Sequence, residues 1–285
     1  MVQYRSRRSR CLGRVIVSVV IVVAAAACSG ATTLPVASTC PGWILTYAVF
    51  KALSRESDAG LLFDNRRTYV IVTASTIGGL RGWLCNPTVD FASYSAMRRA
   101  FDDGSIPAGI VAVLYDNEDW TKTPVPERRN PAAYEELAAA LVHSHHMVFI
   151  TSPAADLVHV LDPNGSGTEF RLYLELDIAG TAARYADVLD IQAQGEEAAI
   201  GDYESFVKQA TAQARAANPK VIVYAGLSTA RAPHAADAMI AAIAATRHAV
   251  SGYWLNVVGS GLNGSSAISA ARQVVRAVTA GLRST

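Results

Sequence analysis

The fold is decided by the stretch Asp187-Val188-Leu189-Asp190-Ile191-Gln192-Ala193-Gln194, in which polar and apolar side chains alternate. Successive residues of an extended strand point to opposite faces, so one face of this strand is polar after Val188 and the other is apolar. A central strand of an open parallel sheet is covered by helices on both faces and is apolar on both. A barrel strand can instead point polar groups into the lumen. The alternation therefore favours a closed barrel over an open doubly wound sheet.

The chain on either side of this stretch repeats strand and helix. Helix starts are marked by Asn130-Pro131, which gives an N-cap and a proline in the first turn, and by Asp202 as a second N-cap. Two segments, 43–53 and 171–176, fit either a strand or a helix. Repeated βα units form a parallel sheet, so residues 43–285 are predicted to be one TIM-like (β/α)8 barrel domain. Strands are predicted at 68–74, 109–115, 147–151, 187–193, 220–225 and 252–257, and helices at 131–145, 202–217, 232–247 and 265–282.

Several of these strands end in polar residues. Ala112 and Leu114 lead to Asp116 and Glu118 on one face, and similar patterns end the strands that contain Tyr224 and Trp254. Because the active site of such a barrel lies at the carboxyl ends of its strands, catalytic and binding residues are expected at these ends, here called the strand tips. The predicted binding residues at these tips are Gln192, Gln194, Tyr224, Ser228, Trp254 and Asn256. The alternative for the aromatic residues, and for Trp120, is a place in the core.

The run Val113-Leu114-Tyr115-Asp116-Asn117-Glu118-Asp119-Trp120 resembles part of a group of actinobacterial secreted proteins and lipoproteins. Residues 185–194, 225–229 and 252–256 are similar to the same group. The resemblance covers most of the chain from about residue 68 to residue 261. It implies a TIM-like barrel comparable in outline to those of glycoside hydrolases, and it carries over no catalytic residue.

The candidate catalytic residues are Asp116, Glu118 and Asp190. Carboxylates two residues apart in extended chain lie on one side, with Cα atoms roughly 6.5 to 7 Å apart. Glycoside hydrolysis needs one carboxylic acid to protonate the leaving oxygen and a second carboxylate as nucleophile or base. Asp116 or Glu118 is a candidate acid, and Asp190 or Glu196 is a candidate partner. The alternatives are a solvated loop for residues 116–119 and a structural polar network around Asp190.

The first 28 residues read as an export signal. Five arginines precede an apolar run, and Ala25-Ala26-Ala27-Cys28 places small residues before a thiol. This pattern predicts a lipoprotein signal peptide at 1–27, lipidation of Cys28 and a flexible tether over 28–42. An ordinary secretory signal and a membrane-spanning anchor are the alternatives, although about thirteen apolar residues fall short of the roughly 20 that a spanning helix needs.

Export bears on the two remaining cysteines, Cys40 and Cys85. In an oxidising compartment they are expected to form a disulfide, with two buried free thiols as the alternative. Without residues 1–27 the chain has 20 basic and 24 acidic residues, a formal charge of −4, which argues against binding to nucleic acid. The sequence has no serine-nucleophile elbow or dinucleotide fingerprint, and His143 and His146 have no suitably placed acid, so we expect neither a cofactor nor a metal site.

Together these features predict an exported, monomeric, lipid-anchored barrel that hydrolyses a carbohydrate through paired carboxylates. Two other hypotheses remain. One is a lipoprotein that binds a small polar solute or a polysaccharide without catalysis. The other is a two-lobed transport receptor, although the chain has no clear linker for a hinge.

Overall fold

The computed structural model describes residues 40–230, 234–258 and 266–283. In this part of the chain, eight parallel strands close into a barrel in chain order, with β1 paired to both β2 and β8. The predicted TIM-like barrel is confirmed, and it begins at Gly42, one residue before the predicted boundary. The predicted signal peptide, Cys28 and most of the tether lie outside the described residues. The strands are β1 (Gly42–Thr46), β2 (Thr68–Ile71), β3 (Asn86–Phe91), β4 (Ala112–Tyr115), β5 (Val148–Thr151), β6 (Val188–Ile191), β7 (Ile222–Ser228) and β8 (Gly252–Asn256).

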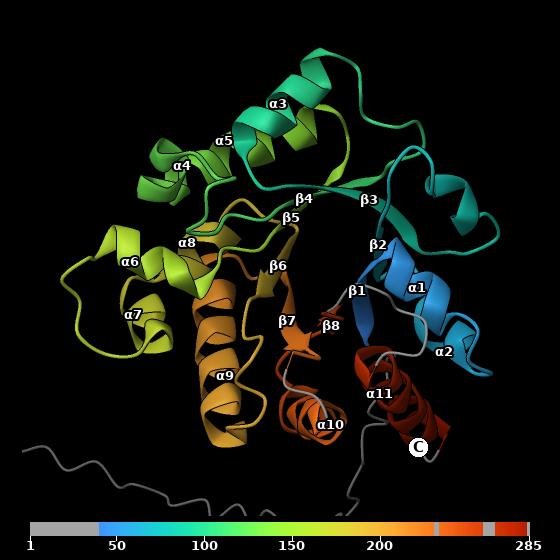
Figure 1. Cartoon of the computed structure of the whole chain (residues 1–285). Coiled ribbons are helices and arrows are strands. Elements are labelled where there is room, and N and C mark those ends of the chain that lie inside the picture. Colours follow the sequence, from blue (N-terminus) through green and yellow to red (C-terminus); the bar gives the residue numbers. More distant parts are fainter. Residues whose placement is uncertain (1–39, 231–233, 259–265, 284–285) are drawn as a thin grey trace, which may run out of the picture. The chain divides into compact units, whose positions relative to one another are not determined.

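Helices connect consecutive strands and surround the barrel (Figure 1). They are α1 (Tyr47–Leu53), α2 (Ala59–Phe63), α3 (Tyr94–Asp102), α4 (Val125–Arg129), α5 (Pro131–Ser144), α6 (Val158–Leu161), α7 (Glu169–Glu175), α8 (Ile178–Ala183), α9 (Ile200–Ala217), α10 (Ala235–Thr246) and α11 (Ser266–Arg283), with short 3-10 helices at Ile77–Leu80 and Ala155–Leu157. None of the described helices is long and apolar enough to cross a membrane.

Most predicted elements are present, and three details differ. The two ambiguous segments are resolved as β1 followed directly by α1, and as the helix α7. The strand β3 was not predicted, because Pro87 in a run of six residues reads as a strand breaker. Asp202 is not an N-cap: α9 begins at Ile200, and Asp202 lies in its first turn, where a negative charge still complements the helix dipole.

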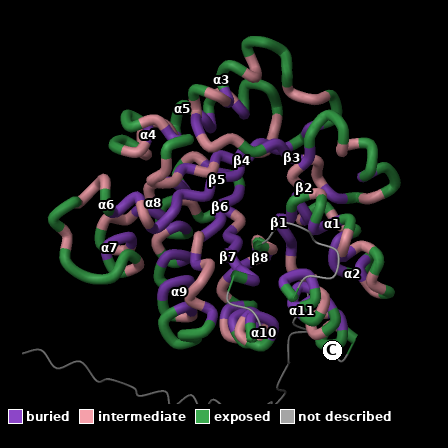
Figure 2. Tube along the Cα trace, in the orientation of Figure 1, coloured by how far each residue is buried: buried purple, intermediate pink, exposed green. Residues whose placement is uncertain are grey.

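Two apolar layers hold the barrel together. The larger one packs the outward side chains of the strands against the helices, and it forms most of the buried band seen along the strands in Figure 2. The smaller layer fills the lumen, with Ile44, Leu114, Ile150, Val188 and Tyr224 among its members. This split assigns a direction to every strand position, so the residue two places after each lumen residue also faces the lumen.

Tyr224 closes the amino-terminal end of the lumen. Its ring is fully buried and packs edge-on against Tyr69, and its hydroxyl donates a hydrogen bond to the carbonyl oxygen of Arg67, just before β2. A Cβ atom at Gly42 or Gly252 would lie within 2.8 Å of this ring or its hydroxyl, so the two glycines make room for it. The Tyr224 hydroxyl is therefore turned away from the strand tips, although Tyr224 pairs with Asp190 of β6 in the sheet, and its contact with a ligand stays a prediction.

The predicted disulfide is not present, and Cys40 and Cys85 are free thiols in the structure. The thiol of Cys40 donates a hydrogen bond of 3.0 Å to the carbonyl oxygen of Leu61 in α2, which turns the sulfur toward that helix. Cys85 is buried just before β3, and burial raises the pKa of its thiol to about 11. The alternative of two free thiols is the one that the structure supports, with Cys85 buried as expected and Cys40 only half-buried.

Candidate active site

The lumen face of four neighbouring strands ends in polar side chains. Asp116 follows Ala112 and Leu114 on this face, and Ser152 follows Ile150. Asp190 follows Val188 within β6, and Asp90 follows Thr88 within β3. Parallel strands in a closed barrel bring their carboxyl ends to one rim, so the four polar groups meet there.

Gln192 connects the members of this site. Its side-chain Nε2 donates hydrogen bonds to Asp116 Oδ1 at 2.7 Å and to the carbonyl oxygen of Ser152 at 3.0 Å. The same nitrogen lies 3.4 Å from Glu118 Oε1. Two carboxylates thus share one amide group, and their nearest oxygens are no more than about 6 Å apart.

Asp116 is the most perturbed acid at the rim. Burial, and then the negative charges of Glu118, Asp90 and Asp190, raise its pKa to about 8. The hydrogen bond from Gln192 acts in the opposite direction, because it favours the ionised form. Such a pKa favours the protonated form of Asp116 at pH 7.

Asp190, at the third position of β6, is fully buried. Its Oδ2 accepts a hydrogen bond of 3.0 Å from the Ser152 hydroxyl, whereas its Oδ1 has no partner. Burial raises its pKa to about 7. A sealed carboxyl group of this kind cannot touch a ligand directly. Its effect on the site is through its charge, which opposes ionisation of Asp116.

Glu118 is nearer to the solvent. Burial, and then the charge of Asp156, raise its pKa, while Gln192 and Lys122 lower it. The residues on either side of it have other roles. Asn117 is fully buried on the outer side of the strand. Asp119 pairs with Arg128 of α4, and its backbone N–H donates to Asp156 at 2.9 Å. The loop 116–119 is thus divided between the site and the structural support of α4.

The other predicted binding residues lie on the β6, β7 and β8 side of the rim. Gln194 packs over Gly226, occupying the space that a Cβ atom would need there. Ser228 is buried, and it holds a turn by accepting a hydrogen bond from the backbone N–H of Ala230. Trp254 packs partly buried against the lumen cluster, and Asn256 at the end of β8 is exposed. Gln194 and Asn256 remain predicted ligand contacts, whereas Ser228 is occupied by its turn.

Trp120 belongs to the wall of the site. Its indole nitrogen donates a hydrogen bond of 2.7 Å to the Thr123 hydroxyl, and the ammonium group of Lys122 lies 4.2 Å from its ring centroid. The Thr123 hydroxyl in turn donates to the carbonyl oxygen of Ala92 at 2.7 Å. Trp120 therefore fixes the loop after β4 to the loop after β3.

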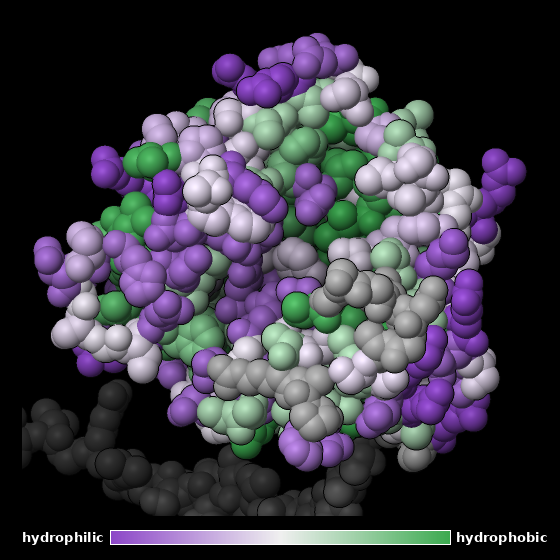
Figure 3. Space-filling view, viewed as in Figure 1, coloured by the Kyte–Doolittle hydropathy of each residue, from purple (hydrophilic) through white to green (hydrophobic). Residues whose placement is uncertain are grey.

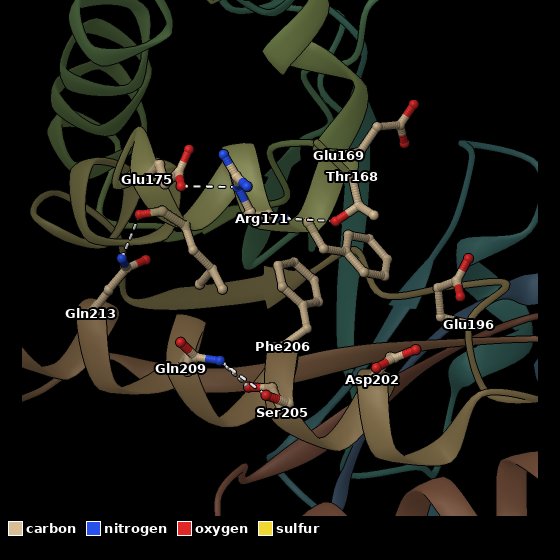
Figure 4. A pocket seen from close by; sticks show the side chains of 12 residues that line it. Thr168, Glu169, Arg171, Glu175, Glu196, Asp202, Ser205, Phe206, Gln209 and Gln213 are labelled. Atoms are coloured by element: carbon tan, nitrogen blue, oxygen red, sulfur yellow. Dashed lines mark hydrogen bonds and ion pairs between the residues drawn. The ribbon is translucent and has the colours of Figure 1, made fainter. Parts of the chain in front are cut away.

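Glu196, the alternative partner acid, lies elsewhere. It lines a groove of about 790 Å³ between α7 and α9, where the rings of Phe170 and Phe206 stack with centroids 4.0 Å apart (Figure 4). Figure 4 shows Glu196 at one end of this groove. Its charge is not among those that raise the pKa of Asp116 or of Glu118. We therefore leave Glu196 out of the acid cluster.

The molecular surface is hollowed at the position that the strands surround. Figure 3 shows this hollow near the centre of the face drawn there, with hydrophilic residues on one side and hydrophobic residues on the other. Asp90, which faces the lumen from β3, is exposed. A ligand can therefore approach the rim from solvent.

Sequence reasoning missed two members of the site, Asp90 and Ser152. Asp90 lies in the unpredicted strand β3, so its alternation with Thr88 was not recognised. Ser152 directly follows β5, and its two-residue spacing from Ile150 is a usable signal. Within the described residues, no group of three or more histidine, cysteine, aspartate or glutamate side chains is arranged to hold a metal ion.

Comparison with known proteins supports the fold and does not name a family. No family model and no curated protein matches the sequence. The barrel is similar to that of a GH18 chitinase from Pseudoalteromonas aurantia, with 12% sequence identity and a TM-score of 0.52 over 81% of this chain and 99% of that one. It is also similar to a GH128 curdlan-specific exo-β-1,3-glucanase from Blastomyces gilchristii, with 13% identity and a TM-score of 0.50 over 81% of this chain and 97% of that one. The chain is thus a (β/α)8 barrel protein with an acidic rim.

Proposed function

We propose that this protein is an exported, lipid-anchored glycoside hydrolase in which Asp116 is the general acid and Glu118 is the second carboxylate. The observation that carries the proposal is the sharing of Gln192 by these two acids at the carboxyl ends of the strands. The two similar barrels named above are a chitinase and a glucanase. That likeness makes the chemistry compatible with the scaffold, and the residues themselves supply the argument.

The roles follow from the environments of the two acids. A general acid has to hold a proton at the working pH, and Asp116, with a pKa of about 8, does so. It donates this proton to the glycosidic oxygen as the bond to the anomeric carbon breaks, and that carbon bonds either to Glu118, from which water later releases the sugar, or directly to a water molecule that Glu118 deprotonates. Glu118 is more exposed and lies closer to Lys122, so it is the better candidate for the ionised group that faces the developing positive charge. Asp190 is a positioning residue, because its charge, when it is ionised, adds to burial and to the charges of Glu118 and Asp90 in opposing the ionisation of Asp116.

The test is a hydrolysis screen of the purified protein on a broad panel of glycans. Asp116→Asn and Glu118→Gln are each expected to lower the rate by roughly 10²- to 10⁴-fold, the usual contribution of a general acid or base. The melting temperature is expected to stay the same or to rise in both variants. Glu118→Gln removes one of several close negative charges, and Asp116→Asn replaces a protonated carboxyl group with a neutral amide of similar size. Glu196→Gln, in the groove between α7 and α9, is the control and is expected to keep full activity. Absence of turnover on the whole panel contradicts the proposal.

Non-catalytic binding is the second candidate, and the sealed position of Asp190 favours it. An acid that is fully buried cannot serve as the nucleophile for a sugar at the rim. Binding of a glycan in an array without hydrolysis, weakened by Gln192→Leu, would support this candidate over the first one.

Export and lipid attachment form a separate part of the proposal, and they rest on residues 1–33 of the sequence. Cys28→Ser is expected to move the protein from the membrane fraction to the soluble fraction, because serine lacks the thiol to which the lipid is proposed to be attached. Detection is by fractionation and by mass spectrometry of the mature amino terminus. A protein that stays in the membrane fraction after this change is not held by lipid on Cys28.

A further inference from the structure

A second cavity lies outside the barrel wall, away from the acidic rim. Its volume is about 290 Å³, at the small end of the range for ligand pockets. It is enclosed by α5 and α8, with the ends of α4 and α6 beside them, and these four helices gather on one side of the barrel (Figure 1). The walls are mainly apolar and include Pro131, Pro153, Leu161, Leu176, Ile178 and Ala182.

Glu135 lines this cavity. It lies in the second turn of α5 and is only 1% exposed, and neither of its carboxylate oxygens has a hydrogen-bond partner. The Thr151 hydroxyl is the nearby donor to Glu135, although the two groups do not meet in ordinary hydrogen-bond geometry. Burial raises the pKa of Glu135 to about 8, and the nearby Thr151 lowers it by a smaller amount.

An unpartnered buried acid is costly to the fold. Buried polar groups in proteins are almost always hydrogen-bonded, and an unpaired ionised group in an apolar site has to be neutralised or paired. Glutamine or leucine would fit the same helix position with a smaller penalty. Glu135 lines a cavity and makes no hydrogen bond of ordinary geometry to the described part of the chain, and the nearby Thr151 hydroxyl can serve only one of its two oxygens, so the other is available to a partner from outside.

Arg129 also lines this cavity. It is the last residue of α4, and its side chain is exposed. In the part of the chain that the structure describes, Arg129 has no ion pair, whereas its neighbour Arg128 is paired with Asp119. Within the described residues, the lining of the cavity thus combines a buried acid without an ion pair, an exposed cation without an ion pair and mainly apolar residues.

We propose that this cavity binds a small zwitterion in which a short apolar chain separates an ammonium group from a carboxylate. The ammonium group donates hydrogen bonds to Glu135, the carboxylate faces Arg129, and the chain packs on Leu161, Leu176 and Ile178. This site is independent of the acidic rim and of any glycosidase activity.

The test is calorimetric titration of the purified full-length protein with three probes of equal chain length. These are 5-aminopentanoate, pentylamine and pentanoate. The zwitterion is expected to bind at least roughly tenfold more tightly than either singly charged probe, since only it pairs with both Glu135 and Arg129. Glu135→Gln is expected to weaken 5-aminopentanoate at least roughly tenfold, and Arg129→Met is expected to reduce its affinity to that of pentylamine.

Glu136→Gln is the matched control. Glu136 is the next residue of α5, is exposed, and accepts a hydrogen bond of 3.2 Å from the Tyr185 hydroxyl. This variant is expected to bind all three probes as the unchanged protein does. A second readout is the melting temperature without any probe, which Glu135→Gln is expected to maintain or raise. The proposal is overturned if none of the probes binds at millimolar concentration, if all three bind equally, or if Glu135→Gln lowers the melting temperature and leaves the affinity unchanged.

Discussion

The two ends of the barrel lumen are built from opposite kinds of side chain. At the amino-terminal end, Tyr69 and Tyr224 fill the lumen, and the buried Tyr224 hydroxyl finds its partner in the carbonyl oxygen of Arg67. At the carboxyl-terminal end, Asp116 and Glu118 share a single amide group, and Asp190 has one oxygen without a partner. At the amino-terminal end the lumen side chains are uncharged and the Tyr224 hydroxyl is hydrogen-bonded, whereas at the carboxyl-terminal end the acids outnumber their hydrogen-bond donors.

This difference shows which end of the barrel stabilises the fold. Close packing and hydrogen bonding at the amino-terminal end of the lumen hold the strands in register. The carboxyl-terminal end brings together like charges and unpaired oxygens, which weakens the fold but leaves groups available for chemistry. Substitutions at the two ends should therefore have opposite consequences for stability and activity.

Gly252→Ala should have the largest effect on stability. The new Cβ atom would lie 2.4 Å from the carbonyl oxygen of Gly42 and 2.8 Å from the ring of Tyr224. Backbone does not yield easily, so the free energy of unfolding should fall by about 3 kcal/mol, at the upper end for overpacking. Urea denaturation measures this change in the free energy of unfolding. Gly201→Ala, in α9 with nothing within 4 Å, is the control and should not destabilise. An equal loss of unfolding free energy in both variants would show that the amino-terminal end of the lumen is not tightly packed.

Part of the pH dependence of stability should come from the carboxyl-terminal end of the barrel, and the buried Glu135, with a pKa of about 8, should add to it. The pKa values of Asp116 and Asp190 are about 8 and about 7 in the folded protein, against roughly 4 for aspartate in an unfolded chain. Between these values the folded state binds more protons, so the free energy of unfolding falls as the pH rises from about 4 to about 8. Each group contributes up to about 1.4 kcal/mol per pH unit.

Urea denaturation at several pH values measures this slope. Asp116→Asn should make it shallower, because the amide does not titrate. Asp202→Asn, which changes an acid in the first turn of α9, is the control and should leave the slope as it is. A slope that Asp116→Asn does not alter would mean that Asp116 is ionised in the folded protein.

Tyr224→Phe should have the smallest effect of the three. It removes the hydrogen bond to the Arg67 carbonyl oxygen, which still accepts one from the backbone N–H of Trp43 at 3.1 Å. The expected loss is about 1 kcal/mol in the free energy of unfolding, the usual net value of one hydrogen bond. Thermal and urea unfolding measure the loss. Any hydrolytic activity should remain unchanged, and a drop in activity at constant stability would connect Tyr224 to the site after all.

The contrast between Asp116 and Tyr224 shows how far pattern reasoning reaches. Alternation correctly predicted that both side chains face the lumen, because a strand places every second residue on one side. It did not distinguish a residue at the third position of β7 from one just beyond the end of β4. Depth along the barrel axis depends on the stagger between strands, which only the assembled sheet defines.

The local order of strands and helices is therefore encoded in the chain. The polar and apolar alternation of residues 187–194, the start of α5 at Asn130-Pro131 and the repeated βα units were sufficient for the closed barrel, because they depend on neighbours in sequence. Tertiary structure alone decided that Gln192 joins Asp116 and Glu118, that Asp190 is sealed, that Cys40 and Cys85 stay apart, and that Glu135 lacks a partner. These hydrogen bonds and this burial depend on residues that are far apart in the sequence, and no local sequence pattern indicates which of them come into contact.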